Sequence, residues 1–171
     1  FDPDGTVHAE PVPAAYEVLT ELEQSLVIVY SGLERPAKVV LGEQKARLDK
    51  LEEGVVSRMH DIKRIGREVY DLLVRGDLDR YGELLHEHWE KKRKLTSNMT
   101  DSLLDEIYQA GRESGAIGGK LMGAGGGGFF MFYVRPAGRR RFASAMAARG
   151  LRILRFRFDD AGARIVANVH G

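Results

Sequence analysis

Residues 120–134 read Lys120-Leu121-Met122-Gly123-Ala124-Gly125-Gly126-Gly127-Gly128-Phe129-Phe130-Met131-Phe132-Tyr133-Val134. Four consecutive glycines stand directly before an apolar run that is typical of a buried β-strand. Glycine loses more backbone entropy on folding than any other residue, so a glycine cluster needs a local reason. The usual reasons are a positive φ angle and a very close approach of the backbone to another group. A second backbone, a phosphate or a sugar would each fit.

The glycine stretch does not fit two common phosphate-binding signatures. A Walker A loop ends in Gly-Lys-Ser/Thr, whereas the lysine here, Lys120, precedes the glycines. A dinucleotide-binding loop runs from a strand into a helix, whereas these glycines run into a strand. A structural alternative is a hairpin whose glycines let neighbouring elements pack closely. Because seven glycines fall between Gly118 and Gly128, we favour a functional loop, or one that touches an active-site element.

The overall composition predicts one globular domain, since the chain has 171 residues, 43% hydrophobic and 30% charged. The net charge of +1 gives no sign of a nucleic-acid partner. The absence of cysteine excludes disulfides, thiolate catalysis and zinc–thiolate sites. Nine arginines fall within 135–171, and we interpret them as a solvated face, with an anionic partner as the alternative.

The sequence has neither an apolar run near the ~20 residues of a membrane span nor a signal-peptide pattern, so we expect a cytoplasmic protein without membrane contact. Because the chain begins with Phe1, we expect it to be processed or part of a longer protein.

Hydrophobic periodicity predicts an α+β domain over residues 1–171, with helices packed on one face of a small, mostly antiparallel sheet. The expected elements are an irregular entry (1–24), a strand (26–30), one bent helix or two helices (37–75), a helix bearing Tyr81, Leu85, His88, Trp89 and Lys92, a third helix opened by a Ser102-x-x-Asp105 capping box and stopped at Gly115, a strand (129–134), a short helix (139–149), a strand (151–158), a hairpin turn (159–162) and a last strand (164–169).

The glycine stretch resembles the C-terminal motif of the GHMP kinases, the superfamily of galactokinase, homoserine kinase and mevalonate kinase. Two further segments are similar to the branch that phosphorylates heptose 7-phosphate, with fucokinase-like relatives next. These segments are His86-Glu87-His88-Trp89-Glu90-Lys91-Lys92-Arg93-Lys94-Leu95 and Tyr30-Ser31-Gly32-Leu33-Glu34-Arg35-Pro36-Ala37, the latter with Gln44 downstream. The resemblance runs from about Phe1 to Tyr133.

The resemblance implies a ferredoxin-like C-terminal half of a two-domain sugar kinase. ATP and Mg²⁺ would be bound mainly by an N-terminal domain that also supplies the catalytic acidic residue and is absent from this chain, so no catalytic residue is expected here. The phosphoryl acceptor would be the anomeric hydroxyl of a sugar phosphate. The alternatives are a fucokinase-like or other GHMP kinase of small molecules, and a stand-alone binding or regulatory module without catalysis. Homodimer formation is a further expectation left open.

The residues expected to line the phosphate and sugar pocket are those of the glycine loop, namely Gly123, Ala124, Gly125, Gly126, Gly127 and Gly128. For the phosphate already on the sugar we expect Lys92 or Arg35, with Ser31 and Gly32 beside the latter. The alternative for the cationic run around Lys92 is a solvated helix face. No metal site is expected, because His86 and His88 point to different faces of a helix. We expect Trp89 to lie in the core.

Overall fold

The computed structural model describes residues 2, 4–34, 36–50, 53–94, 102–124, 126–159 and 161–162. Its helices and strands follow in the order α1 (Tyr16–Ser25), β1 (Leu26–Tyr30), α2 (Ala37–Asp49), α3 (Glu53–Arg75), α4 (Leu78–Lys92), α5 (Ser102–Glu113), β2 (Gly118–Leu121), β3 (Phe129–Tyr133), the 3-10 turn η1 (Pro136–Gly138), α6 (Arg139–Ala147) and β4 (Arg152–Leu154). The predicted last strand, 164–169, lies outside the described residues.

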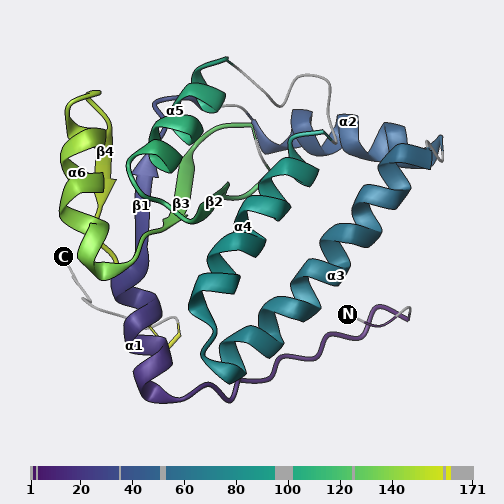
Figure 1. Ribbon diagram of the computed structural model, residues 1–171. Helices are drawn as coiled ribbons and strands as arrows, with labels where there is room; N and C mark the ends of the chain where they lie inside the picture. Colours follow the sequence, from purple (N-terminus) through teal and green to yellow (C-terminus); the bar gives the residue numbers. More distant parts are fainter. Residues whose placement is uncertain are drawn as a thin grey trace, which may run out of the picture.

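Three antiparallel pairings join four strands into one sheet, in the order β2-β3-β1-β4. The element order is β-α-β-β-α-β if the helices between β1 and β2 are taken as one crossover, which is the ferredoxin-like arrangement. Figure 1 shows α6 beside the β4 edge of the sheet, and α3 and α4 beyond the β2 edge. The prediction of an α+β domain with a small antiparallel sheet is confirmed.

Several predicted boundaries are wrong, each for a local reason. The entry segment is helical from Tyr16 onward. Its prolines Pro11 and Pro13 disfavour regular structure only before that point, and Val18 and Leu22 then lie one helical turn apart. The helical region 37–75 is not such a case, since it divides into α2 and α3, which is the two-helix alternative that the sequence left open. Helix α5 begins at Ser102 itself, and the carboxylate of Asp105 accepts a hydrogen bond from Arg93 at 2.9 Å instead of completing a capping box.

Two predictions about strands also need correction. Glycine-rich residues 118–121, taken from the sequence as part of a loop, form β2, because their backbone pairs with that of β3. The predicted strand 151–158 is regular only over Arg152–Leu154, where it pairs with β1.

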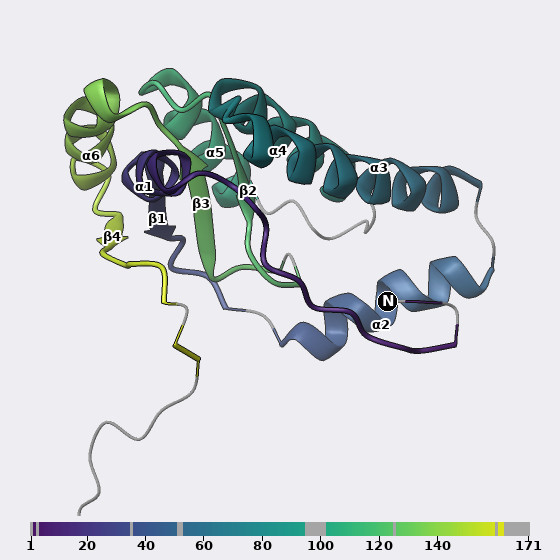
Figure 2. The ribbon, with the colours of Figure 1, turned by 90° about the horizontal axis from the view of Figure 1, so that it is seen from below.

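The two faces of the sheet carry separate hydrophobic clusters. On the first face, Phe130 and Phe132 pack under α5 and α6, together with Trp89 from α4. Trp89 is fully buried, which confirms its predicted place in the core. On the second face, Tyr133 packs against residues of α1, α3 and α4, among them Tyr81. Helix α4 therefore flanks the β2 edge and contributes to both clusters, and α3 lies beside it in both ribbon views (Figure 1 and Figure 2).

The contact between α4 and β2 is closer than any side chain would permit. A Cβ atom placed on Gly118 would lie 1.9 Å from the carbonyl oxygen of Gly82, and one placed on Gly82 would lie 2.6 Å from the Tyr133 ring. A Cβ atom on Gly119 would lie 2.6 Å from the ring of Phe132. Glycine is thus required in β2 by packing alone. Among the described residues, no helix is both long and apolar enough to cross a membrane.

We predict that Gly118→Ala destabilises the protein by about 1–3 kcal/mol or more, because the added methyl group forces β2 away from α4. Urea unfolding followed by circular dichroism measures the change. The matched control is Gly42→Ala in α2, where nothing lies within 4 Å of the added carbon and helix propensity favours alanine by about 1 kcal/mol. Equal stabilities of the two variants would contradict the close contact.

Candidate functional site

The glycine turn, residues 122–128, connects β2 to β3 and is closed by a hydrogen bond from the Met122 amide to the Phe129 carbonyl at 2.8 Å. Gly123, Gly127 and Gly128 have φ angles of 70°, 142° and 89°. Residues with a side chain rarely adopt such angles, so conformation accounts for glycine at these three positions. Gly125 lies outside the described residues, and Ala124 packs against a small cluster between α2 and α3 that includes Val40 and Val55.

The glycine turn lies directly on the segment that follows β1. The amide of Gly128 donates to the carbonyl of Leu33 at 2.7 Å, and the amide of Ser31 donates to the carbonyl of Gly128 at 2.8 Å. A Cβ atom on Gly127 would lie 2.5 Å from the Leu33 carbonyl oxygen. Of the neighbours that the sequence left open for the glycines, a second backbone is therefore present, and it is supplied by residues 31–34.

Ser31 and Gly32 form this neighbouring segment, and their positions explain their identities. Ser31 is buried, and its hydroxyl accepts a hydrogen bond from the Leu33 amide at 3.2 Å. Gly32 is exposed and has a φ angle of 77°. Both residues adjoin the glycine turn as the sequence predicted, although the Ser31 hydroxyl is engaged in its own turn. Arg35, the predicted phosphate ligand, lies outside the described residues.

Lys92 reaches the glycine turn from the last turn of α4. Its ammonium group donates a hydrogen bond to the carbonyl of Gly123. The neighbouring cations point elsewhere, since Lys91 pairs with Asp61 at 2.6 Å and Arg93 pairs with Asp105 at 2.9 Å. Within the cationic run, Lys92 is thus the described residue that contacts the predicted loop.

Lys120 and His88 lie close to Lys92, and sequence reasoning did not select either as a site residue. Burial, followed by repulsion from Lys120, lowers the pKa of Lys92 to about 8. Burial likewise lowers the pKa of Lys120. Burial and the positive charges of Lys120 and Lys92 lower the pKa of His88 to about 4, so its ring is neutral at pH 7. The sequence pattern that could have identified Lys120 is strand alternation. It puts Lys120 and Leu121 on opposite faces of β2 once that segment is known to be a strand.

A pocket of about 260 Å³ adjoins this cluster between α3, α4 and the second face of the sheet. His88 and Lys120 stand at its polar part, and the other lining residues are Ile62, Ile65, Gly66, Val69, Tyr81, Leu85 and Met131. The buried Nδ1 atom of His88 has no hydrogen-bond partner among the described residues. Unpartnered buried polar atoms are rare in folded proteins, so this nitrogen marks a place where a polar group would be stabilised.

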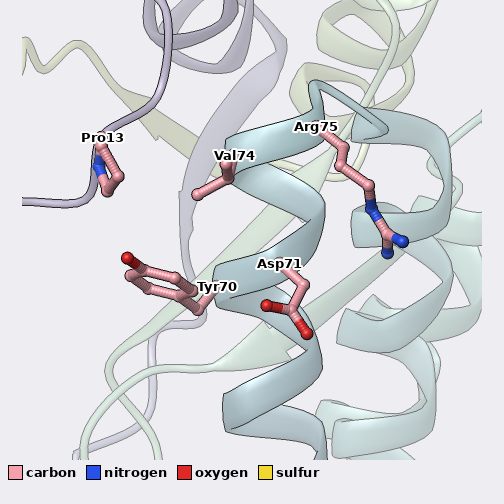
Figure 3. A pocket seen from close by; sticks show the side chains of 5 residues that line it. All are labelled: Pro13, Tyr70, Asp71, Val74 and Arg75. Carbon is pink, nitrogen blue, oxygen red and sulfur yellow. The ribbon is translucent and has the colours of Figure 1, made fainter.

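A second pocket lies between the entry segment and the C-terminal half of α3. Figure 3 shows Tyr70 and Val74 on the side of Pro13, with Asp71 and Arg75 on the other side of the helix. Its volume is about 230 Å³. None of the predicted site residues lines this pocket, whereas the glycine turn contacts the other half of α3 through Ala124.

The chemistry around the glycine turn suits phosphate oxygens. The described cations Lys92 and Lys120 and the turn's amide groups are donors for an anion. Mg²⁺ prefers carboxylate and other oxygen ligands, and within the described ranges no group of three or more His, Asp or Glu side chains could hold a metal ion. His86 lies apart from this site, since its Nδ1 atom is 2.7 Å from the hydroxyl of Tyr108.

Comparison with known families is consistent with the ferredoxin-like fold and with the glycine turn between two of its strands. Residues 69–151 match the family described as GHMP kinases C terminal. This stretch of the chain is therefore similar to the C-terminal domain of the GHMP kinases, as the sequence motifs indicated. The match extends past Tyr133, the position up to which the sequence shows its resemblance.

Particular relatives are kinases of sugars and sugar phosphates. A D-glycero-alpha-D-manno-heptose 7-phosphate kinase of Campylobacter jejuni subsp. jejuni serotype O:2 is 27% identical over 147 residues, covering 86% of this chain and 43% of the relative. A bifunctional fucokinase/GDP-fucose pyrophosphorylase of Arabidopsis thaliana is 29% identical over 130 residues, covering 74% of this chain and 12% of the relative. The chain spans less than half the length of these curated relatives.

Solved structures support the fold. The crystal structure of a D-glycero-D-manno-heptose 1-phosphate kinase from Bacteriodes thetaiotaomicron superposes with a TM-score of 0.63 at 22% identity, covering 91% of this chain and 39% of that chain. At this level of identity the likeness establishes the shared architecture alone.

We predict that Gly127→Ala weakens the contact between the glycine turn and residues 31–34. The new methyl group would overlap the Leu33 carbonyl, which costs about 1–3 kcal/mol beyond the strain of a positive φ angle. Amide hydrogen exchange of Ser31, whose amide donates to Gly128, should accelerate. Gly123→Ala serves as the control, since its φ angle is also positive but nothing lies within 4 Å of the added carbon. Equal exchange of the Ser31 amide in both variants would refute the prediction.

Proposed function

We propose that this chain is the C-terminal half of an ATP-dependent sugar kinase. The enzyme would transfer the γ-phosphoryl group of ATP to the anomeric hydroxyl of a sugar that already carries a phosphate, as in heptose 7-phosphate. In that reaction the sugar oxygen bonds to the γ-phosphorus, ADP leaves, and the hydroxyl proton passes to a base. Phosphoryl transfer of this kind depends mainly on positioning and on stabilising the charge of the phosphoryl oxygens.

The observation that carries the proposal is the convergence of three segments at one end of the sheet. The glycine turn, residues 31–34 and Lys92 meet there through the backbone bonds to Leu33 and the bond from Lys92 to Gly123. The similarity to a heptose 7-phosphate kinase and to a fucokinase supports a sugar as the acceptor. In the proposed enzyme the glycine turn, including Gly125 and Gly126, would line the pocket for phosphate and sugar.

An N-terminal domain outside this chain would supply the remaining chemistry. It would hold most of the nucleotide and Mg²⁺, which neutralises phosphate charge when bound, and provide the acidic catalytic residue. This division fits the described donors near the glycine turn, which are amides and ammonium groups suited to phosphate. A location in the cytoplasm and homodimer formation remain predictions of the same proposal.

We predict that the 171 residues alone have negligible kinase activity and that activity appears when the N-terminal domain is present. The reason is that a glycine turn without Mg²⁺ ligands and a base provides only part of the required transition-state stabilisation. Release of ADP, measured with heptose 7-phosphate, unphosphorylated heptose and fucose as acceptors, tests both statements. The phosphorylated heptose should react best. Substantial turnover by the 171 residues alone would refute this division, and a preference for fucose would favour the fucokinase-like alternative.

We also predict that Lys92→Ala and Arg35→Ala, made in the two-domain protein, raise KM for the sugar phosphate. Loss of a charge-assisted bond to phosphate should raise KM about tenfold. Lys91→Ala is the matched control, because Lys91 lies next in sequence but pairs with Asp61. If KM for the sugar phosphate stays unchanged in Lys92→Ala and Arg35→Ala, neither residue binds that phosphate. If no acceptor is phosphorylated by the two-domain protein, the stand-alone binding module becomes the better interpretation.

A further inference from the structure

Two half-buried lysines lie near the glycine turn, and neither has an acidic partner among the described residues. Lys120 projects from β2 and Lys92 from α4. The charge of Lys120 lowers the pKa of Lys92, and the charges of both lysines lower the pKa of His88. Within the described part of the chain, neither ammonium group forms an ion pair with a carboxylate, and neither pKa is shifted by one. The nearest paired cation on α4 is Lys91, which faces Asp61 on α3 instead.

Such an arrangement is unfavourable in the absence of an anion. Partly buried charges lose hydration, and proteins normally compensate this loss with an opposite charge. Here the two ammonium groups repel each other, and Lys92 has only the carbonyl of Gly123 as a described hydrogen-bond acceptor. The buried and unpartnered Nδ1 atom of His88 lies among the same groups. Two cations and one unpartnered polar nitrogen thus occur close together, and a doubly charged anion would stabilise all three.

We propose that Lys92, Lys120 and His88 together form a binding subsite for a phosphate monoester, at the junction of the glycine turn and the apolar pocket. The two lysines provide the positive charge, and neutral His88 provides a hydrogen bond from Nδ1. A phosphate monoester carries about −1.5 to −2 charges at pH 7, which matches two ammonium groups better than a carboxylate does. This proposal rests on the proposed function, in which the group bound here is the phosphate that the sugar already carries.

The apolar walls of the adjoining pocket limit what else can bind there. Ile65, Val69, Leu85 and Met131 offer no hydrogen bonds from their side chains, so the sugar hydroxyls must lie toward the glycine turn. The phosphate therefore lies beside the ammonium groups of Lys92 and Lys120, and the sugar extends from it toward residues 122–128. This orientation points the end of the sugar opposite its phosphate at the place where the glycine turn meets residues 31–34.

The affinity for phosphate should depend on pH in a defined direction. Lys92 has a pKa that burial and the charge of Lys120 lower to about 8 in the free protein. The groups that face it are Lys120 from β2 and His88 from its own helix, whereas Asp61 on α3 faces Lys91. A bound anion raises the pKa of Lys92, so binding requires its protonated form. The affinity is therefore highest below about pH 8 and falls as the pH rises further, whereas the phosphate itself is fully ionised above its own pKa of about 6.

The first experiment measures lysine titration by NMR in the 171-residue chain with isotope-labelled lysine. Inorganic phosphate is compared with sodium chloride at equal ionic strength, and heptose 7-phosphate and ATP are then compared with unphosphorylated heptose. We expect inorganic phosphate and heptose 7-phosphate to raise the pKa of both Lys92 and Lys120, while Lys91 does not respond. A rise caused by ATP but not by heptose 7-phosphate would assign the subsite to the nucleotide and overturn the proposal. Titration curves of Lys92 and Lys120 that are unchanged by every phosphate would also overturn it.

The second experiment uses variants of the same site. Lys120→Met should weaken the binding of heptose 7-phosphate about tenfold, as expected for one charge-assisted hydrogen bond, whereas Lys91→Met should have little effect. Lys92→Arg keeps a permanent positive charge, so it should bind at pH 7.5 and show a smaller loss of affinity above pH 8. Circular dichroism confirms that each variant is folded. Wild-type affinity in Lys120→Met would overturn the proposal.

The subsite and the kinase reaction can fail separately. If phosphate shifts both lysines but the two-domain protein phosphorylates no sugar, the subsite stands and the proposed reaction is wrong. If the two-domain protein phosphorylates the sugar phosphate and Lys120→Met leaves its KM unchanged, the reaction stands and the subsite is wrong.

Discussion

The close contact between α4 and β2 is the constraint on which the candidate site depends. Because the backbone of Gly118 lies against the carbonyl of Gly82, α4 runs directly along the edge of the sheet. This position lets Trp89 enter the first hydrophobic cluster and Tyr81 enter the second. It also carries His88 to the face from which Lys120 projects, and it brings Lys92, at the end of α4, to the glycine turn. A side chain in this interface would separate all of these groups at once.

The same contact creates the unusual electrostatics of the site. Lys92 and Lys120 come from elements that pack too closely for a further side chain between them, and their surroundings are largely apolar. Burial then disfavours both charges, and their mutual repulsion adds to the effect on Lys92. The burial of Lys92 and Lys120 thus offsets part of the stability that the contact between α4 and β2 provides. A bound anion would compensate the two charges and recover that stability. Binding sites commonly combine a rigid scaffold with a locally unfavourable group in this way.

The sequence predicts the strongly periodic parts of the fold and fails where glycine replaces side chains. The apolar runs of β1 and β3 and the helical spacing of α4 and α5 were sufficient to assign those elements. Strand β2 has no such pattern, because two of its four residues are glycines that are selected by packing against α4 and Phe132. The glycine turn and Lys92 were found from their motif, whereas Lys120 and His88 were missed because their neighbourhood depends on β2 being a strand. Helix α1 was missed because two nearby prolines outweighed a short amphipathic pattern.

The glycine-rich stretch therefore combines two functions that the sequence alone cannot separate. Gly118 and Gly119 are needed by packing, and no ligand is required to explain them. Gly127 is needed by its contact with Leu33, which joins the turn to the end of β1. Gly123 differs from these, since its positive φ angle leaves open space around it and its carbonyl is held by Lys92. A ligand that binds at this turn would thus meet backbone at the Gly123 end, beside Lys92, because the Gly127 end is already occupied by the chain itself.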